Sequence, residues 1–435
     1  MTVRLLYSVM WWLVLPLVLG RLWLRGRREP GYRKHWLERL GCYGSDVIAS
    51  PGLTLWVHAV SVGETRAAEP LIDALLAAWP QSRIVLTHMT PTGRATGQAL
   101  YAKHGARLVQ SYLPYDTTPM VGRFIKHFQP VVCLLMETEV WPNLIAVCAR
   151  KQIPVALVNA RLSERSLGKA QRLGRLMQDA ARGIALVAAQ TEADAQRVRS
   201  LGVASVVVTG SIKFDVTPPE RALVVGARMR ASIGARRVLL CASTRDGEEA
   251  LILDAFVRAQ VAPDVLLVIV PRHPQRFGSV AGMIEERSLH GLRRSRLEDG
   301  PGTLSSDVQV LLGDSMGEMF AYYTACDCAF IGGSLLPLGG QNLIEACALG
   351  KPVLVGPHTF NFDLVTQDAI DIQAALRVID ADDVMRQGLR LLADDGLRAA
   401  MGIEAEGFAT RHRGATLRTL ALLQPLIENS RVWSR

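Results

Sequence analysis

The chain has 435 residues, too many for one ordinary hydrophobic core and suited to two α/β domains of about 150–200 residues each. Its residues are 49% hydrophobic and 20% charged, a composition that excludes an intrinsically disordered chain. The net charge of +9 predicts acidic partners, which are anionic lipid, a phosphorylated substrate or nucleic acid.

Residues 1–28 predict an N-terminal membrane anchor. The stretch from Leu5 to Gly20 carries no charge, but it is shorter than the roughly 20 apolar residues of a spanning helix, and Pro16 lies inside it. A secretory signal is not expected, because no small-x-small cleavage site follows. We therefore expect an uncleaved anchor that is monotopic or barely spans the membrane. A buried core helix is the alternative.

A basic run follows the apolar segment. It consists of Arg21, Arg25, Arg27, Arg28, Arg33, Lys34 and Arg39, against only Glu29 and Glu38. Positive charge at this place favours the cytoplasmic side and attracts anionic lipid head groups. The seven cysteines are an odd number without the spacing of a zinc site, which argues for a reducing compartment.

After the anchor, short apolar strands alternate with helices. In the first half we expect strands at 53–57, 83–87, 131–136, 155–158, 184–188 and 206–209, and helices at 65–78, 93–104 and 144–150. Such alternation predicts a parallel, doubly wound sheet. A linker is expected near 215–220, which contains Pro218 and Pro219, so the predicted domains are 1–28, 29–217 and 218–435.

The same alternation restarts after the linker. Strands are expected at 238–242, 265–270, 308–311, 329–332 and 353–356, and helices at 248–260, 277–287 and 317–324. Two such domains place a ligand crevice between the carboxyl ends of facing sheets. The stretch 397–423 is expected to be helical and to pack back across the linker.

Acidic residues follow two strands of the first domain. Glu64 is expected at the start of a helix, where it is either a general base or an ordinary helix-start charge. Glu137 and Glu139 end an apolar strand, where charges are costly unless they are paired or used. We expect these two residues to act in a site or to organise one.

Other polar residues of the first domain are expected to line the same mouth. They are Thr92, Arg94, Asn159 and Arg161, although each of them could be ordinary loop chemistry. Lys213 follows the last strand of this domain. It could offer a positive charge to a phosphate or carboxylate, and a solvated lysine is the alternative.

A glycine-rich stretch in the second domain predicts a phosphate site. Gly332, Gly333, Gly339 and Gly340 let a backbone approach a bulky anion, and a helix start then favours a phosphate. Asn342 and the residue three positions later, Glu345, should lie on one side of that helix, where a carboxylate could bind ribose hydroxyls. An ordinary strand–loop–helix turn is the alternative.

Two further loops of the second domain carry candidate contacts, and two classes of ligand are not expected. Arg272 follows an apolar strand as a candidate phosphate contact, and Gly317 opens a helix. The Asp380-Ala-Asp382 sequence is interpreted as a helix N-cap and not as a metal pair. We expect no metal or other cofactor, and no nucleic acid, since the basic residues lack interleaved aromatic residues.

Together these blocks resemble the 3-deoxy-D-manno-octulosonic acid (Kdo) transferases of lipopolysaccharide synthesis. The resemblance covers nearly the whole chain. It is carried by residues 58–64, 136–143, 159–166, 213–215, 271–277, 316–318, 342–345 and 356–362. So many blocks in one order are more specific than any single loop.

The resemblance implies an α/β GT-B glycosyltransferase fold of two Rossmann-like domains, and it assigns roles to individual residues. Glu64 is similar to the catalytic base, and Glu137, Thr138, Glu139 and Lys213 are similar to positions that stabilise the transition state. The expected contacts to CMP are Pro271, Arg272, Met316, Gly317, Glu318, Asn342, Leu343, Ile344 and Glu345.

The resemblance also implies a reaction and a location. The donor would be CMP-Kdo, the acceptor a tetraacyl lipid A precursor (lipid IVA), and transfer would invert the anomeric configuration. The enzyme would lie on the cytoplasmic side of the inner membrane, in contact with anionic lipids. Two alternatives are another membrane-associated GT-B enzyme that uses a UDP-sugar, and a membrane-tethered scaffold protein without activity.

Overall fold

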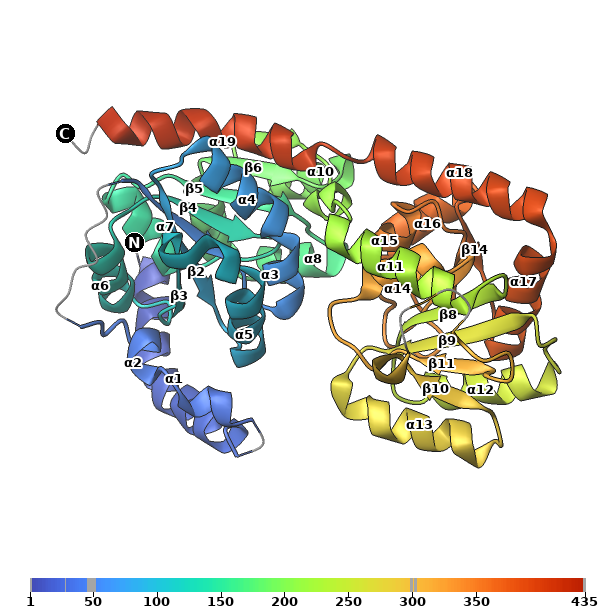
Figure 1. Cartoon of the computed structure of the whole chain (residues 1–435). Coiled ribbons are helices and arrows are strands. Elements are labelled where there is room, and N and C mark those ends of the chain that lie inside the picture. Colours follow the sequence, from blue (N-terminus) through green and yellow to red (C-terminus); the bar gives the residue numbers. More distant parts are fainter. Residues whose placement is uncertain (1, 28, 45–51, 298–299, 301–302, 433–435) are drawn as a thin grey trace. The chain divides into compact units, whose positions relative to one another are not determined.

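The computed structural model describes residues 2–27, 29–44, 52–297, 300 and 303–432, which form two compact units (Figure 1). Unit 1 comprises residues 1–215 and 413–435, and unit 2 comprises residues 216–412. The terminal helix, expected within residues 218–435 and expected to pack back across the linker, therefore belongs to unit 1. Arg28 of the basic run lies outside the described residues.

Unit 1 is built on a parallel sheet. Its seven strands in the described part of the chain have the order β3-β2-β1-β4-β5-β6-β7. They are β1 (Thr54–His58), β2 (Arg83–His88), β3 (Leu108–Tyr112), β4 (Pro130–Met136), β5 (Val155–Ala160), β6 (Leu186–Ala189) and β7 (Val206–Val208). The central strands are buried on both faces, because helices cover both sides of the sheet. The predicted doubly wound sheet is confirmed.

The helices of unit 1 cover two hydrophobic cores, one on each face of the sheet. They are α1 (Thr2–Arg25), η1 (Pro30–Arg33), α2 (Trp36–Arg39), α3 (Val62–Ala67), α4 (Glu69–Ala78), α5 (Pro91–Leu100), η2 (Ala102–Arg107), α6 (Thr118–Phe128), α7 (Pro142–Arg150), α8 (Glu164–Arg172), α9 (Arg175–Arg182), α10 (Glu192–Ser200), η3 (Ile212–Asp215) and α19 (Ala415–Val432). Leu55 belongs to one core, and the next residue, Trp56, belongs to the other, as strand alternation requires.

The terminal helix α19 completes one of these cores. Leu423 and Ile427 are fully buried with Leu55, and α19 contacts α4 and β4. The Asp215 carboxylate accepts hydrogen bonds from the backbone N–H groups of Gly414 and Thr416 at the start of this helix. These contacts explain why the end of the chain packs with unit 1.

Unit 2 repeats the parallel architecture. Its seven described strands have the order β10-β11-β9-β8-β12-β13-β14. They are β8 (Arg237–Thr244), β9 (Val265–Pro271), β10 (Gly291–Arg293), β11 (Val310–Leu312), β12 (Cys328–Ile331), β13 (Val353–Val355) and β14 (Ala375–Arg377). The two edge strands β10 and β14 were not predicted, because each has only three residues and a weak apolar pattern.

The helices of unit 2 lie between these strands and after them. They are α11 (Glu220–Ile233), α12 (Glu248–Arg258), η4 (Pro274–Arg276), α13 (Phe277–Glu286), η5 (Arg294–Arg296), α14 (Met319–Ala325), α15 (Ile344–Cys347), α16 (Asp363–Asp371), α17 (Ala381–Ala393) and α18 (Asp395–Arg411). The predicted helical stretch 397–423 is divided between α18 and α19, because the chain turns at Gly414, whose φ is +90°.

Each sheet has one point where the strand order reverses direction, which we call its switch point. It lies between β1 and β4 in unit 1, and between β8 and β12 in unit 2. Doubly wound sheets bind ligands outside the carboxyl ends of the strands at this point. This topology therefore favours ligand binding at the loops that follow these four strands.

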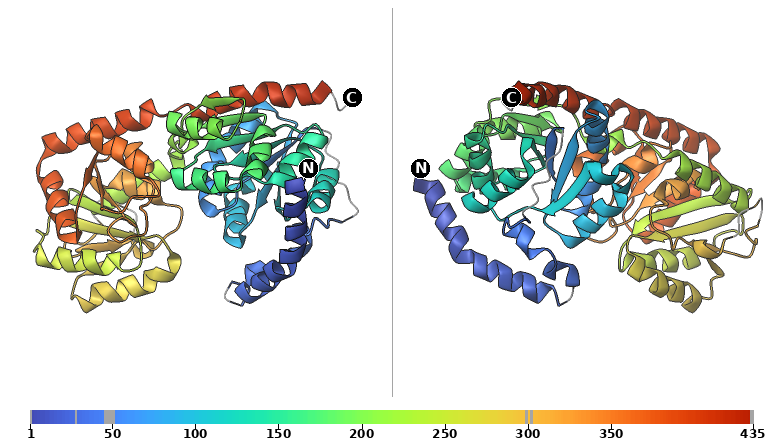
Figure 2. Two further views of the ribbon diagram at one scale, coloured as in Figure 1. Left: turned by 180° about the vertical axis from the view of Figure 1, so that it is seen from behind. Right: turned by 60° about the vertical axis from the view of Figure 1, so that its left-hand side comes forward.

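Helix α1 runs along the outside of unit 1 (Figure 2). It is the one helix in the described residues that is long and apolar enough to cross a membrane. Leu6, Leu13 and Leu17 are 70%, 72% and 73% exposed, respectively. Such exposure contradicts the alternative of a buried core helix.

Candidate functional site

Glu64 lies at the switch point of unit 1, in the first turn of α3. Its Oε2 accepts a hydrogen bond from the Ser61 N–H at 2.8 Å, and the Ser61 Oγ accepts one from the Glu64 N–H at 3.4 Å. This reciprocal pair is a capping box, so the helix-start role is confirmed. The same bonds fix the carboxylate of Glu64, a residue that is only 9% exposed, beside the end of β1.

The turn after β4 brings Glu137 and Glu139 to the other side of the switch point. Glu137 has a φ of +55°, a conformation that costs a non-glycine residue about 1–3 kcal/mol. Its N–H donates to the Val158 carbonyl at 3.0 Å, which holds the turn against β5. Thr138 is exposed at the tip of the turn, and Glu139 returns to a half-buried position. The strained turn therefore presents two carboxylates at the edge of the sheet.

Glu137 is held by a lysine and an asparagine. Lys213 Nζ lies 2.8 Å from Glu137 Oε1, and Asn159 Nδ2 lies 3.5 Å from the same oxygen. The Asn159 Oδ1 accepts a hydrogen bond from the Ile212 N–H at 3.1 Å. Asn159 therefore links the end of β5 to the η3 turn that carries Lys213. Four residues predicted from separate motifs, Glu64, Glu137, Asn159 and Lys213, meet at one end of this sheet.

Burial and mutual repulsion change the acidity of these carboxyl groups. Burial raises the pKa of Glu64, and the Glu137 charge raises it further. Burial also raises the pKa of Glu139 to about 7, and the Glu64 charge adds to that increase. A carboxylate with a raised pKa is a stronger base near neutral pH, so this cluster is suited to accept a proton.

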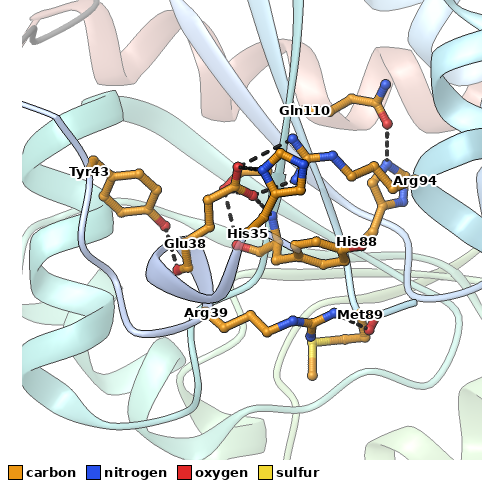
Figure 3. Close-up of polar contacts among 10 residues, drawn as sticks. His35, Glu38, Arg39, Tyr43, His88, Met89, Arg94 and Gln110 are labelled. Carbon is orange, nitrogen blue, oxygen red and sulfur yellow. Dashed lines mark hydrogen bonds and ion pairs between the residues drawn. The ribbon is translucent and has the colours of Figure 1, made fainter. Parts of the chain in front are cut away.

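Arg94 and Thr92 lie on α5, at the margin of this cluster. The Arg94 guanidinium is paired with Glu38 of α2, with Nη2 and Oε1 3.2 Å apart (Figure 3). Sequence reasoning missed Glu38, because its partner is 56 residues away along the chain. Thr92 is exposed, and Arg161 lies beside the Glu137 turn, with its N–H 3.4 Å from the Glu137 carbonyl.

Glu248 occupies the switch point of unit 2. Its side chain is completely buried and accepts hydrogen bonds from the N–H groups of Arg245 at 2.8 Å, Gly333 at 2.6 Å and Leu335 at 2.9 Å. Arg245 follows β8, while Gly333 and Leu335 follow β12. Glu248 therefore ties together the two loops at the switch point. The sequence signal for this residue was a carboxylate in the first turn of a helix directly after a buried strand.

The glycines after β12 are required by the packing of the loop itself. A Cβ atom on Gly332 would lie 2.6 Å from the Thr244 Cα and 2.7 Å from the Ser243 carbonyl oxygen. Gly333 has a φ of +70°, which a side chain would disfavour. Close approach of β12 to β8 is thus one physical reason for these glycines, and approach to an anion stays a prediction.

Basic side chains gather beside the loop after β8. The Arg272 N–H donates to the Thr244 carbonyl at 2.9 Å, which places Arg272 next to this loop. Burial lowers the pKa of His273, and the charges of Arg245 and Arg272 lower it further. Arg276 is paired instead with Asp246, at 2.7 Å, and with Glu249, at 3.2 Å. The loop is therefore electropositive near Arg245 and Arg272.

The helix predicted to start at Asn342 begins two residues later in the structure. Helix α15 begins at Ile344 and has only four residues. Asn342 Oδ1 accepts the Ile344 N–H at 3.1 Å, and its Nδ2 donates to Glu345 Oε1 at 3.3 Å, so the predicted placement of the two side chains on one side is confirmed. Leu343 and Ile344 have buried side chains.

The remaining predicted residues of unit 2 end β9 or precede α14. Pro271 is buried at the end of β9, and Met316 is exposed. Gly317 has a φ of +81°, and Glu318 accepts a hydrogen bond from the Ser315 hydroxyl at 2.6 Å. Within the described ranges there is no group of three or more His, Cys, Asp or Glu residues that could hold a metal ion.

Comparison with protein families identifies relatives of this sequence. A family model described as 3-deoxy-D-manno-octulosonic-acid transferase (kdotransferase) matches residues 34–216. A protein of Bordetella pertussis named 3-deoxy-D-manno-octulosonic acid transferase is 44% identical over 416 residues, covering 94% of this chain and 96% of the relative. A protein of the same name from Haemophilus influenzae is 35% identical over 433 residues, covering 98% of this chain and 99% of the relative.

Solved structures with a similar fold are more distant in sequence. A glycosyltransferase from Rickettsia africae has a TM-score of 0.58 and 12% identity, covering 87% of this chain and all of the other chain. The UDP-GlcNAc 2-epimerase of Neisseria meningitidis, solved with UDP-GlcNAc, has a TM-score of 0.57 and 15% identity over 86% of this chain. The predicted GT-B arrangement of two α/β sheets is confirmed by these similarities together with the two sheets described above.

Proposed function

The chain belongs to the Kdo transferases, glycosyltransferases of lipopolysaccharide biosynthesis, and we propose that it transfers Kdo from CMP-Kdo to a tetraacyl lipid A precursor, lipid IVA. The observation that carries this proposal is the identity of 44% and 35% to proteins of that name over nearly the full length. The carboxylate cluster of unit 1 supplies the chemistry that such a transfer requires.

In this mechanism Glu64 is the general base. A glucosamine hydroxyl of the acceptor is a weak nucleophile, and a carboxylate that takes its proton during attack accelerates transfer. Three features support this role: Glu64 is fixed by the capping box, it is mostly buried, and its pKa is raised by burial and by Glu137. Glu139, Thr138 and Lys213 would stabilise the charges that develop around the reacting sugar.

Unit 2 would hold the donor. Arg272 and the Asn342–Glu345 turn are proposed to contact the phosphate and ribose of CMP, with Pro271 and residues 316–318 beside them. The positive charge near Arg245 and Arg272 supports this assignment, because CMP leaves as an anion. A ribose carries two hydroxyl groups, and a carboxylate such as that of Glu345 can accept a hydrogen bond from each of them.

The chemical step would be one displacement at the anomeric carbon of Kdo. The acceptor oxygen forms the new bond as the bond to the CMP phosphate oxygen breaks, and the acceptor proton passes to Glu64. Attack opposite the leaving group inverts the configuration, and the sugar passes through an oxocarbenium-like state. We propose that no metal takes part, since a monophosphate leaving group carries less charge than a diphosphate.

We also propose that α1 attaches the enzyme to the cytoplasmic side of the inner membrane. The exposed leucines of α1 would contact lipid, and the basic run after it would attract anionic head groups. A lipid acceptor is confined to that membrane, so attachment would raise its concentration near the enzyme.

Product analysis tests this proposal directly. Full-length enzyme would be incubated in detergent with CMP-Kdo and tetraacyl lipid A precursor, and mass spectrometry should detect the precursor with Kdo added. Isothermal titration should show binding of CMP without binding of UDP. Binding of UDP together with no Kdo product would favour a transferase that uses a UDP-sugar.

A further inference from the structure

One face of the anchor helix α1 makes polar contacts with unit 1. The Tyr7 hydroxyl donates to Asp116 Oδ2 at 2.9 Å, and the Ser8 hydroxyl lies 3.1 Å from Asn143 Oδ1. Further along the same face, the Trp11 ring packs on Tyr115 with centroids 5.7 Å apart, and Leu15 is buried. A helix that served only to reach lipid would not need hydroxyl groups bonded to the protein.

Asp116 connects this face to the start of α7. Its side chain is 1% exposed, and its two oxygens accept the backbone N–H groups of Asn143 at 3.0 Å and Leu144 at 2.7 Å. Helix α7 has no side-chain cap of its own at Trp141. Asp116 therefore supplies the cap from a distant part of the chain, and Tyr7 binds the same carboxylate.

Helix α7 directly follows the turn that carries Glu137 and Glu139. The turn is strained, and it ends at Trp141, one residue before α7 begins. A strained segment keeps its conformation only when its ends are fixed by the surrounding structure. Tyr7 and Asp116 fix one of these ends.

The segment after α1 makes a second connection, to the loop of Glu64. Glu38 of α2 pairs with Arg94 of α5 and accepts the Tyr112 N–H at 2.8 Å (Figure 3). The start of α5 in turn contacts the loop before Glu64, where the Thr90 hydroxyl donates to the Val60 carbonyl at 3.3 Å. A Cβ on Gly93 would lie 3.2 Å from that carbonyl oxygen. Glu38 thus holds the helix against which the Glu64 loop packs.

We propose that residues 2–27 and 29–44, which we call the brace, position the two carboxylate loops of unit 1 in addition to attaching the chain to lipid. One arm of the brace runs from Tyr7 through Asp116 to the Glu137–Glu139 turn. The other runs from Glu38 through α5 to the loop of Glu64. Tyr7 and Glu38 are positioning residues, and their assumed effect on turnover rests on the proposed function.

Hydrogen exchange of full-length variants in detergent tests the brace without reference to activity. Tyr7→Phe removes only the hydroxyl, and Glu38→Gln keeps the shape of the side chain. Tyr7→Phe should speed amide exchange in residues 137–144, and Glu38→Gln should speed it in residues 59–67, with unit 2 unchanged. Glu192→Gln is the matched control, because Glu192 forms an exposed pair with Arg199 at 2.6 Å. Unchanged exchange in both loops would overturn the brace.

Turnover provides the second measurement. Each of the two variants should lower kcat about fivefold and leave KM for donor and acceptor within about twofold, because misplaced catalytic groups weaken the transition state more than ground-state binding. Glu192→Gln should match the wild type. A fall confined to thermal stability, with kcat unchanged, would contradict a positioning role. If the wild type forms no Kdo product while exchange changes as expected, the proposed function fails and the brace stands.

Discussion

The two switch points share a parallel topology, yet they use their carboxylates in opposite ways. In unit 1, Glu64, Glu137 and Glu139 lie near one another, and their repulsion contributes to the raised pKa values of Glu64 and Glu139. In unit 2, the buried Glu248 carboxylate is satisfied by three backbone N–H groups. One switch point gathers several carboxylates, and the other uses a single carboxylate to shape a loop.

The difference follows from how each carboxylate is stabilised. Backbone N–H groups that point at a carboxylate satisfy its lone pairs and hold it in one position. Carboxylates that face each other without enough donors are instead easier to protonate. In unit 1, burial is the first cause of the raised pKa values of Glu64 and Glu139, and a neighbouring carboxylate is the second.

Glu64→Gln should cause the greatest loss of activity, and it tests the carboxylate cluster of unit 1. Glutamine can keep the capping box, so the helix start should survive while the proton acceptor is lost. We expect kcat to fall by about 10²–10⁴-fold, the usual contribution of a general base, with CMP affinity unchanged by calorimetry. Turnover within a few-fold of the wild type would remove Glu64 from the mechanism.

Glu248→Gln tests whether the buried carboxylate of unit 2 shapes the loop after β12. The new amide N–H₂ group would face a backbone N–H, so at least one buried donor loses its partner, at a cost of about 1–3 kcal/mol. We expect a lower unfolding midpoint of unit 2 and roughly tenfold weaker CMP binding, because the loop after β12 loosens. Exposed Glu286→Gln is the matched control.

The two units can be followed separately in this experiment. All tryptophans of the sequence lie in the residues of unit 1, so tryptophan fluorescence reports unit 1 alone, while circular dichroism reports both units. Glu248→Gln should lower only a transition seen by circular dichroism. A matching loss in the fluorescence transition, or unchanged CMP affinity, would contradict a clamp confined to unit 2.

Glu137→Gln tests the repulsion among the carboxylates of unit 1 through the pH dependence of the reaction. The Glu137 charge raises the pKa of Glu64, so its removal should lower that pKa. A base is active when ionised, and the acid limb of kcat should therefore move to lower pH in the variant, while the maximal rate falls because Lys213 loses its charged partner. Glu192→Gln should leave the acid limb in place. A shift to higher pH would mean that another group limits the rate.

The sequence predicted the central strands and the acids beside them, because apolar runs followed at once by charges are visible locally. Asn159 was expected to line the same mouth as Glu137 because parallel strands end at one edge of a sheet, whereas the pairing of Lys213 with Glu137 was not predicted. Short edge strands such as β14 were missed, since three residues carry too little pattern.

Long-range partners were the part that sequence reasoning could not reach. The bond from Tyr7 to Asp116 spans 109 positions, and the contact of Glu248 with Gly333 spans 85. The terminal helix was expected to pack back across the linker, but its partners, the core residues near the start of the chain that Leu423 and Ile427 join, were not. Periodicity says that a helix is amphipathic, but it does not say which surface receives the apolar face.

Asp380→Ala should lower the stability of unit 2 only slightly, and it tests a second acid of that unit. The sequence predicted Asp380 as an N-cap, and its side chain accepts the Asp383 N–H at 2.8 Å at the start of α17. Loss of such a cap costs about 1 kcal/mol, whereas Asp382→Ala removes only an exposed pair with Arg258 and should cost less than about 0.5 kcal/mol. Urea unfolding followed by circular dichroism would measure both. Because neither acid is expected to hold a metal, EDTA should leave the two unfolding curves and the Kdo transfer rate unchanged. If EDTA instead lowered the activity of the wild type but not that of Asp380→Ala, Asp380 and Asp382 would be assigned a metal-binding role in the reaction.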